Sequence, residues 1–275
     1  MTSVVNSGIA SVHPLPTENA SPDKLAETFR RLDEWRHLPD YQLERRADIF
    51  FALYLQQVVQ EATGVDLSST LIPELPIKRD LVWPEKPGYQ SVKVDYALFS
   101  KDGNQVYFVE LKTNQGSRRV EQDTYLSRAK AIGFHAVVDG IVQISRRTKA
   151  RCKYHRLLCE LEGLGFVRLP PDLPNYLYPR PRVGLTARLR AIEVTARDPK
   201  VNLLYVQPRS DGSPDTIGFD AFARLVQQHP DPLSQLFARY LVRWQLDAAT
   251  EPPGEEDLDG QDESTPASAL VPTKP

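Results

Sequence analysis

The stretch Lys93–Thr113, KVDYALFSKDGNQVYFVELKT, decides the expected fold of this chain. Two apolar runs, 94–99 and 106–111, lie on either side of a polar segment at 101–104 that reads Lys-Asp-Gly-Asn. Short runs rich in β-branched and aromatic residues, separated by such a turn, predict a β-hairpin.

Charged side chains interrupt both apolar runs. Asp95 lies early in the first run, and Glu110 and Lys112 lie at the end of the second. In an antiparallel hairpin the start of one strand lies beside the end of the next, and residues two apart leave the same face of a strand. Two carboxylates and one ammonium group are therefore expected to converge at one end of a sheet.

An Asp followed about fifteen residues later by Glu-x-Lys suits metal-dependent hydrolysis of phosphodiesters. Two carboxylates supply the hard oxygen ligands that Mg²⁺ prefers, and Mg²⁺ keeps its other positions for water and phosphate. Such a metal lowers the pKa of a bound water and offsets charge in the transition state, and Lys112 can orient or deprotonate that water. Leu111 is expected to point into the core, and its backbone carbonyl is a further candidate metal ligand. Mn²⁺ is the expected substitute for Mg²⁺.

These residues resemble the motif of the PD-(D/E)xK nuclease superfamily, whose members have the restriction-endonuclease-like fold. The match is Asp95 followed by Glu110-Leu111-Lys112 on adjacent apolar strands, with a helix before them and a helix and a strand after. The resemblance implies that Asp95 and Glu110 are metal ligands and that Lys112 is the catalytic lysine. Val94 stands where the eponymous Pro would be, a position that varies widely in the superfamily.

Many members of this superfamily carry a further acid on the helix before the sheet. Glu44 is the first candidate for that role here, and it would support a second metal or a water. Asp48 is the second candidate, and Glu61 is third because it falls at the end of the expected helix. A solvated helix edge is the competing interpretation of Glu44 and Asp48.

Members related to the RecB nuclease add a Gln and a Tyr, four residues apart, on the next helix. In this chain the residue four before Tyr125 is Glu121, whereas Gln122 is only three before it. The chain therefore departs from that subgroup, and ordinary surface roles are the competing interpretation of Gln122 and Tyr125.

The order of the expected elements predicts an α/β fold in which helices flank a mixed central β-sheet. The nuclease-like core is expected to be restriction-endonuclease-like and to be followed by a C-terminal α/β extension. We expect helices at 21–37, 39–63 and 120–132, a helix that follows the basic run from residue 145 and reaches residue 162, and one long helix or two at 219–247. We expect strands at 75–81, 134–144, 166–169 and 202–207. We expect a disordered N-terminus at 1–20, the core at 21–165, the extension of unknown role at 166–247, and an acidic disordered tail at 248–275.

The distribution of charge is compatible with a nucleic-acid partner. The net charge is −2, but the acidic tail from Glu251 onward accounts for an excess of acids, and the rest of the chain is mildly basic. Basic residues cluster after the expected strand at 134–144, and they are candidates for binding the phosphates of DNA or RNA. These candidates are Arg146, Arg147, Lys149 and Arg151. A solvated helix start is the competing interpretation.

The sequence gives no sign of a membrane or zinc protein. No apolar run reaches membrane-spanning length, and the first residues lack the pattern of a signal peptide. We therefore expect a cytoplasmic protein with no membrane partner. Cys152 and Cys159 are expected to be free thiols in a reducing compartment, and the five histidines show no zinc-ligand spacing.

Two functions from different classes fit these observations. The leading hypothesis is a Mg²⁺-dependent nuclease, a hydrolase acting on DNA or RNA through Asp95, Glu110 and Lys112. The alternative is a catalytically inactive nuclease-fold module that binds nucleic acid or a protein partner. Apolar residues of the expected helices at 219–247 could pack into the core or form a homodimer or partner surface, and core packing is the preferred interpretation.

Overall fold

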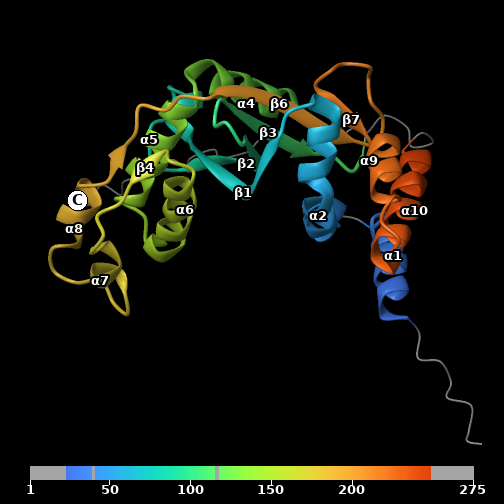
Figure 1. The fold of residues 1–275 in the computed structure, drawn as a ribbon, viewed down its shortest axis with the longest axis horizontal. Coiled ribbons are helices and arrows are strands. Elements are labelled where there is room, and N and C mark those ends of the chain that lie inside the picture. Colours follow the sequence, from blue (N-terminus) through green and yellow to red (C-terminus); the bar gives the residue numbers. More distant parts are fainter. Residues whose placement is uncertain (1–22, 39–40, 115–117, 249–275) are drawn as a thin grey trace, which may run out of the picture.

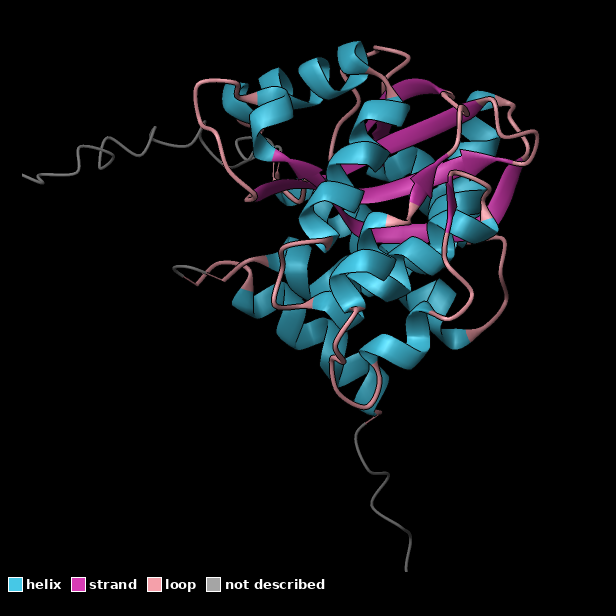
Figure 2. Ribbon diagram, turned by 90° about the vertical axis from the view of Figure 1, so that its left-hand side faces the viewer, coloured by secondary structure: helices cyan, strands magenta, loops and turns pink. Residues whose placement is uncertain are grey.

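A mixed β-sheet between two layers of helices forms the centre of the protein in the computed structural model, which describes residues 23–38, 41–114 and 118–248 (Figure 1). Figure 2 shows the strands as a twisted layer with helices on both sides. This architecture confirms the predicted class, an α/β protein with a helix-flanked mixed sheet. The predictions for 1–20 and for the tail after Ala248 lie outside the described residues.

The sheet has the strand order β1-β2-β3-β6-β7. The bounds are Leu67–Lys78 for β1, Ser91–Ser100 for β2, Gln105–Leu111 for β3, Lys200–Gln207 for β6 and Thr216–Gly218 for β7. β2 pairs antiparallel with both β1 and β3, whereas β6 runs parallel to β3 and β7 runs parallel to β6. The parallel pairing of β3 with β6 requires a long crossover, which the helices between them supply.

The predicted hairpin is confirmed as β2 and β3. Its turn is held by Ser100, whose hydroxyl accepts from the backbone amide of Gln105 at 2.9 Å and contacts Asp102. Gly103 has a φ of 71°, a conformation that favours glycine. The register pairs Tyr96 with Val109, so that one step further along the hairpin Asp95 lies opposite Glu110.

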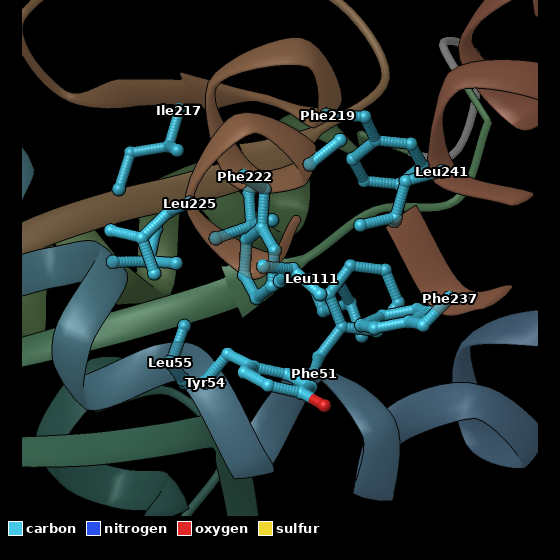
Figure 3. Close-up of a cluster of buried hydrophobic side chains, with 14 of the residues drawn as sticks. Phe51, Tyr54, Leu55, Leu111, Ile217, Phe219, Phe222, Leu225, Phe237 and Leu241 are labelled. Carbon is cyan, nitrogen blue, oxygen red and sulfur yellow. The ribbon is translucent and has the colours of Figure 1, made fainter. Parts of the chain in front are cut away.

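One face of the sheet is covered by α1 (Lys24–Trp35), α2 (Leu43–Thr63), α9 (Phe219–Val226) and α10 (Pro232–Asp247). Figure 3 shows part of this core, in which Phe51 of α2 meets Phe222 and Phe237 of the two C-terminal helices. Leu111 of β3 enters the same cluster, as predicted. The apolar side of the C-terminal helices is thus used for core packing, and Trp244 is fully buried.

The other face is covered by α4 (Val120–Ile132), α5 (Phe134–Ser145) and α6 (Arg151–Gly163), with the shorter α7 (Leu173–Leu177) and α8 (Leu185–Arg190) beyond them. Phe134 and Phe166 pack together here against Phe99 of β2. The two layers therefore bury both faces of β2 and β3, which explains why these strands are apolar on both sides.

Two helix ends have the residues that capping rules favour. α1 begins after Asp23, whose side chain accepts from the backbone amide of Leu25 at 3.0 Å. Gly64, with a φ of 68°, ends α2 directly after the predicted helix at 39–63.

The segment 134–144 was predicted to be a central strand, and this prediction was wrong because the structure forms α5 there. A short, almost wholly apolar run fits a buried helix as well as a buried strand, so periodicity does not separate them. The expected strand at 75–81 is displaced too: β1 starts at Leu67, and α3 (Arg79–Val82) follows it.

Residues beyond 165 complete the central sheet. The predicted strand at 202–207 forms β6, which lies between β3 and β7, so the sheet crosses the expected boundary between core and extension. The predicted strand at 166–169 forms β4 (Val167–Arg168), which pairs only with β5 (Glu193–Val194) in a separate small sheet. Among the described residues, no helix is long and apolar enough to cross a membrane.

Candidate active site

Asp95 and Glu110 lie side by side on the hairpin, as the register requires. The backbone amide of Leu111 donates to Asp95 Oδ2 at 2.8 Å, which fixes the Asp95 carboxylate beside the end of β3. Strand alternation places Asp95 on the face of Ala97, and Glu110 on the face of Phe108. Both of these apolar residues belong to the core under α4 and α5, so the two carboxylates share that face.

Glu110 is completely buried. Its Oε2 accepts from Gln122 Nε2 of α4 and lies 3.6 Å from Lys112 Nζ. Its Oε1 is buried and has no hydrogen-bond partner within the described part of the chain. A buried carboxylate oxygen without a partner is costly to the fold, so this atom marks a position where a further positive group would be accommodated.

Burial raises the pKa values of both carboxyl groups of the pair. Burial raises the pKa of Glu110 to about 9; the neighbouring Asp95 adds to that rise and Lys112 opposes it. Burial also raises the pKa of Asp95, against the Leu111 hydrogen bond and Lys112, which lower it. With its pKa raised to about 9, Glu110 keeps its proton at neutral pH.

The backbone of Lys112 is held by β6, the strand that follows the crossover. Its backbone amide donates to the carbonyl of Val206 on β6 at 2.8 Å, so β3 remains paired one residue beyond its assigned end. The Lys112 side chain is 7% exposed and turns toward Glu110. Because it is so little exposed, the ammonium group of Lys112 is positioned by contacts with protein atoms and not by water.

Glu44 lies at the start of α2, half-buried near the same end of the sheet. Burial raises its pKa, while the charges of Lys112 and Asp95 act on it in opposite directions. Asp48 is exposed, and its side chain accepts from the neighbouring amide of Ile49. Glu61 is also exposed. Of the three candidate helix acids, Glu44 is the one in the electrostatic field of the carboxylate pair.

Gln122 belongs to the site, although its spacing from Tyr125 argued against this. Residues three apart on a helix share a face nearly as well as residues four apart. Gln122 accordingly reaches Glu110, while Tyr125 donates from its hydroxyl to the carbonyl of Lys93 on β2 at 2.9 Å. Glu121, which has the family's spacing, is exposed and lies 3.9 Å from Lys86.

The four basic candidates that follow α5 have different surroundings in the structure. Arg146 donates to the carbonyls of Leu189 and Ile192, at 3.2 and 3.4 Å, and so ties α5 to the end of α8. Arg147 and Lys149 are exposed and accessible to a polyanion. Arg151 begins α6 and is half-buried, with its Nε unpartnered among the described residues.

Within residues 23–38, 41–114 and 118–248, no three His, Cys, Asp or Glu side chains converge on a metal-sized site. The oxygen atoms of Asp95, Glu110 and the Leu111 carbonyl are the groups here that could hold a divalent cation, with water completing its shell. Mg²⁺ tolerates such sites because it retains several waters. Both cysteines are free and exposed on α6.

The fold and site define an α/β protein in which a buried carboxylate (Glu110), a half-buried carboxylate (Asp95), a lysine and a glutamine meet at one end of a mixed sheet. No protein-family model, curated protein or solved structure matches the chain.

Proposed function

We propose that this chain is a metal-dependent nuclease, a hydrolase of the PD-(D/E)xK type that cleaves phosphodiester bonds in DNA or RNA. The observation that carries the proposal is the pairing of the half-buried Asp95 with the fully buried Glu110, which face each other on the hairpin beside Lys112. The partnerless Oε1 of Glu110 gives the pair an unused ligand atom.

The order of elements around the pair supports the proposal. α2 precedes the sheet, and α4 and the parallel strand β6 follow the hairpin, which is the sequence of elements that the superfamily resemblance implies. α2 contributes Glu44, α4 contributes Gln122, and β6 holds the backbone of Lys112. Each neighbouring element thus supplies or positions one group around the two carboxylates.

Hydrolysis requires a water oxygen to attack phosphorus while one P–O ester bond breaks and the leaving oxygen gains a proton. Lys112 Nζ can orient this water and donate a hydrogen bond to the phosphate oxygen on which charge develops. Gln122 holds Glu110 in one orientation, and Glu44 can accept a proton or position a second water. Bound Mg²⁺ or Mn²⁺ would supply Lewis-acid stabilisation of the developing charge and lower the pKa of the water.

The test is cleavage of labelled DNA and RNA with Mg²⁺ or Mn²⁺. We expect Asp95→Asn and Lys112→Met each to reduce the rate by about 100-fold or more, because both remove groups that act on the transition state. Asp48→Asn is the matched control: it removes a carboxylate one turn along α2 from Glu44, and its rate should stay close to wild type. Equal cleavage by all four proteins would refute the assignment.

One observation favours the alternative function, a catalytically inactive module that binds nucleic acid or a protein partner. Gln122 and Lys112 already contact Oε2 of Glu110, so part of the network closes without a metal. Calorimetric titration with Mn²⁺ separates the two functions: a nuclease site should release or absorb heat in wild type but not in Asp95→Asn. Absence of heat from the wild-type protein favours the inactive module. The choice of DNA over RNA, a cytoplasmic location and a protein partner for the C-terminal helices all stay predictions.

A further inference from the structure

Two arginines stack on two aromatic rings beside the loop that leads from α3 into β2. The Arg128 guanidinium carbon lies 4.5 Å from the centre of the Trp83 ring, and the Arg147 guanidinium carbon lies 4.4 Å from the centre of the Tyr89 ring. Both arginines are exposed, and Tyr89 is 43% exposed. We call Trp83, Tyr89, Arg128 and Arg147 the stacked platform.

The charge of the stacked platform is not neutralised by neighbouring acids. Nearby Lys78 and Lys86 also approach the rings, but each has an acidic partner, Asp80 and Glu121 respectively. Within the described ranges, neither Arg128 nor Arg147 forms an ion pair. Their guanidinium groups therefore keep N–H donors for an anionic ligand.

The loop presents these groups in a preorganised form. Two prolines, Pro84 and Pro87, restrict the backbone between the rings. Gly88 has a φ of 146°, which side-chain-bearing residues rarely adopt, and it precedes Tyr89. Arg128 Nη1 donates to the carbonyl of Val82 at 2.7 Å, which holds the guanidinium plane over Trp83. The loop and its side chains therefore lose little conformational entropy when a ligand binds.

Residues of α4 contact both the carboxylate pair and the stacked platform. Gln122 contacts Glu110, Tyr125 contacts the strand of Asp95, and Arg128 belongs to the platform. These three residues follow one another at intervals of three on α4, so Arg128 lies about 9 Å along the helix axis from Gln122. Tyr89 also precedes β2 by only two residues.

We propose that the stacked platform binds unpaired bases of a single-stranded nucleic acid and delivers that strand to the carboxylate pair, which makes single strands the substrate class of the proposed nuclease. Aromatic rings and guanidinium planes both stack with exposed bases. Bases inside a duplex are already stacked on one another and present only their edges. A surface that combines flat groups with cationic donors therefore selects unpaired strands.

The test measures binding without cleavage, so it does not depend on the nuclease assignment. Fluorescein-labelled single strands of about 20 nucleotides, as DNA and as RNA, are titrated with full-length protein in EDTA, alongside the DNA duplex of the same sequence. Fluorescence anisotropy reports the affinity. Wild type should bind at least one of the single strands more tightly than the duplex.

Three variants and one control locate the binding surface. Tyr89→Ala should weaken single-strand binding by about fivefold or more, whereas Tyr89→Phe, which keeps the ring, should bind like wild type. Arg147→Gln should lower the slope of log affinity against log salt by about 0.7, the value for one phosphate contact on a single strand. Arg239→Gln, on the exposed side of α10, removes an equal charge and should change neither.

The outcomes separate the two proposals. Platform-dependent binding of single strands without any cleavage in Mg²⁺ or Mn²⁺ supports the platform and refutes the nuclease. Cleavage of duplex and single strands at equal rates, with Tyr89→Ala and Arg147→Gln indistinguishable from Arg239→Gln, refutes the platform and leaves the nuclease standing. Preference for the duplex, or no binding of either single strand, also refutes the platform.

Discussion

At the scale of single residues, the site is defined by a carboxylate whose surroundings oppose its charge. Glu110 is buried beside Asp95, with Lys112 as its nearest cation and one oxygen without a partner in the described chain. Such an arrangement costs stability unless something else compensates it. The charged form of Glu110 is therefore expected to destabilise the fold.

The buried Glu110 carboxyl group predicts that the stability of the metal-free protein depends on pH. The pKa of Glu110 is raised to about 9 in the folded state, chiefly by burial, against about 4.3 in an unfolded chain. Between these values the unfolded chain has lost a proton that the folded chain keeps. The contribution of Glu110 to stability is therefore greatest below about pH 4, and it falls as pH rises toward 9, by up to about 1.4 kcal/mol per unit.

Glu110→Gln removes this titration, so the variant should be more stable than wild type above neutral pH, and the difference should shrink on acidification. Urea unfolding in EDTA at about pH 5 and about pH 8 measures both values. Glu121→Gln is the control, because Glu121 is exposed and its substitution should leave the pH profile unchanged. Parallel profiles for Glu110→Gln and wild type would contradict the burial argument.

At the scale of helices and strands, an element could be predicted from the sequence where its local pattern of residues fits only one kind of secondary structure. The hairpin followed from its turn and two apolar runs, and the positions of Asp95, Glu110 and Lys112 followed from strand geometry. α5 could not be distinguished from a strand, because its neighbours bury it on nearly every side. Gln122 was recognised only through its contact with Glu110, since a three-residue spacing also occurs on ordinary helix faces.

The packing of α5 yields a prediction of its own. Gly140 lies inside α5 where the helix meets β1, and an added Cβ would come within 2.8 Å of Leu81 Cδ1 and 3.0 Å of Lys78 Cβ. Helix propensity alone favours replacing this glycine, but overpacking outweighs that gain for a larger side chain. Gly140→Val should lower the free energy of unfolding by about 1–3 kcal/mol.

Gly163, at the end of α6, is the matched control for this experiment. An added Cβ there would meet no atom within 4 Å, and Gly163 is not among the glycines with positive φ. Gly163→Ala should therefore leave stability unchanged or increase it. Denaturant unfolding of both variants checks the pair, and equal effects at the two glycines would show that close packing of α5 on β1 is not what requires Gly140.

At the scale of the whole molecule, the two ends of the described chain share one core. α1 packs on α10, where Trp244 Nε1 donates to Asp33 Oδ1 at 3.1 Å and Arg243 pairs with Asp33 at 2.9 Å. α2 packs on α9 and α10 through Phe51, Phe222 and Phe237. The apolar face of α2 is thus covered by helices that come some 170 residues later in the chain.

This arrangement predicts that the first part of the chain does not fold alone. A truncated protein of residues 1–165 keeps the hairpin and α2, but it lacks β6, β7, α9 and α10. Its exposed β3 edge and uncovered apolar faces should prevent a cooperative thermal transition, which circular dichroism and calorimetry would detect. A sharp transition with near-native helix content would show that the expected 21–165 core is an independent domain.

The hydrogen bond between the Lys112 amide and the Val206 carbonyl has a consequence for synthesis on the ribosome. A nascent chain exposes both carboxylates and the lysine long before β6 has been translated, and at about 5–20 residues per second the delay lasts several seconds. During that interval the end of β3 lacks its pairing with β6, so the Val206 carbonyl does not yet hold the backbone of Lys112. If the protein is a nuclease, it therefore emerges from the ribosome, next to the messenger RNA being read, before its site is assembled.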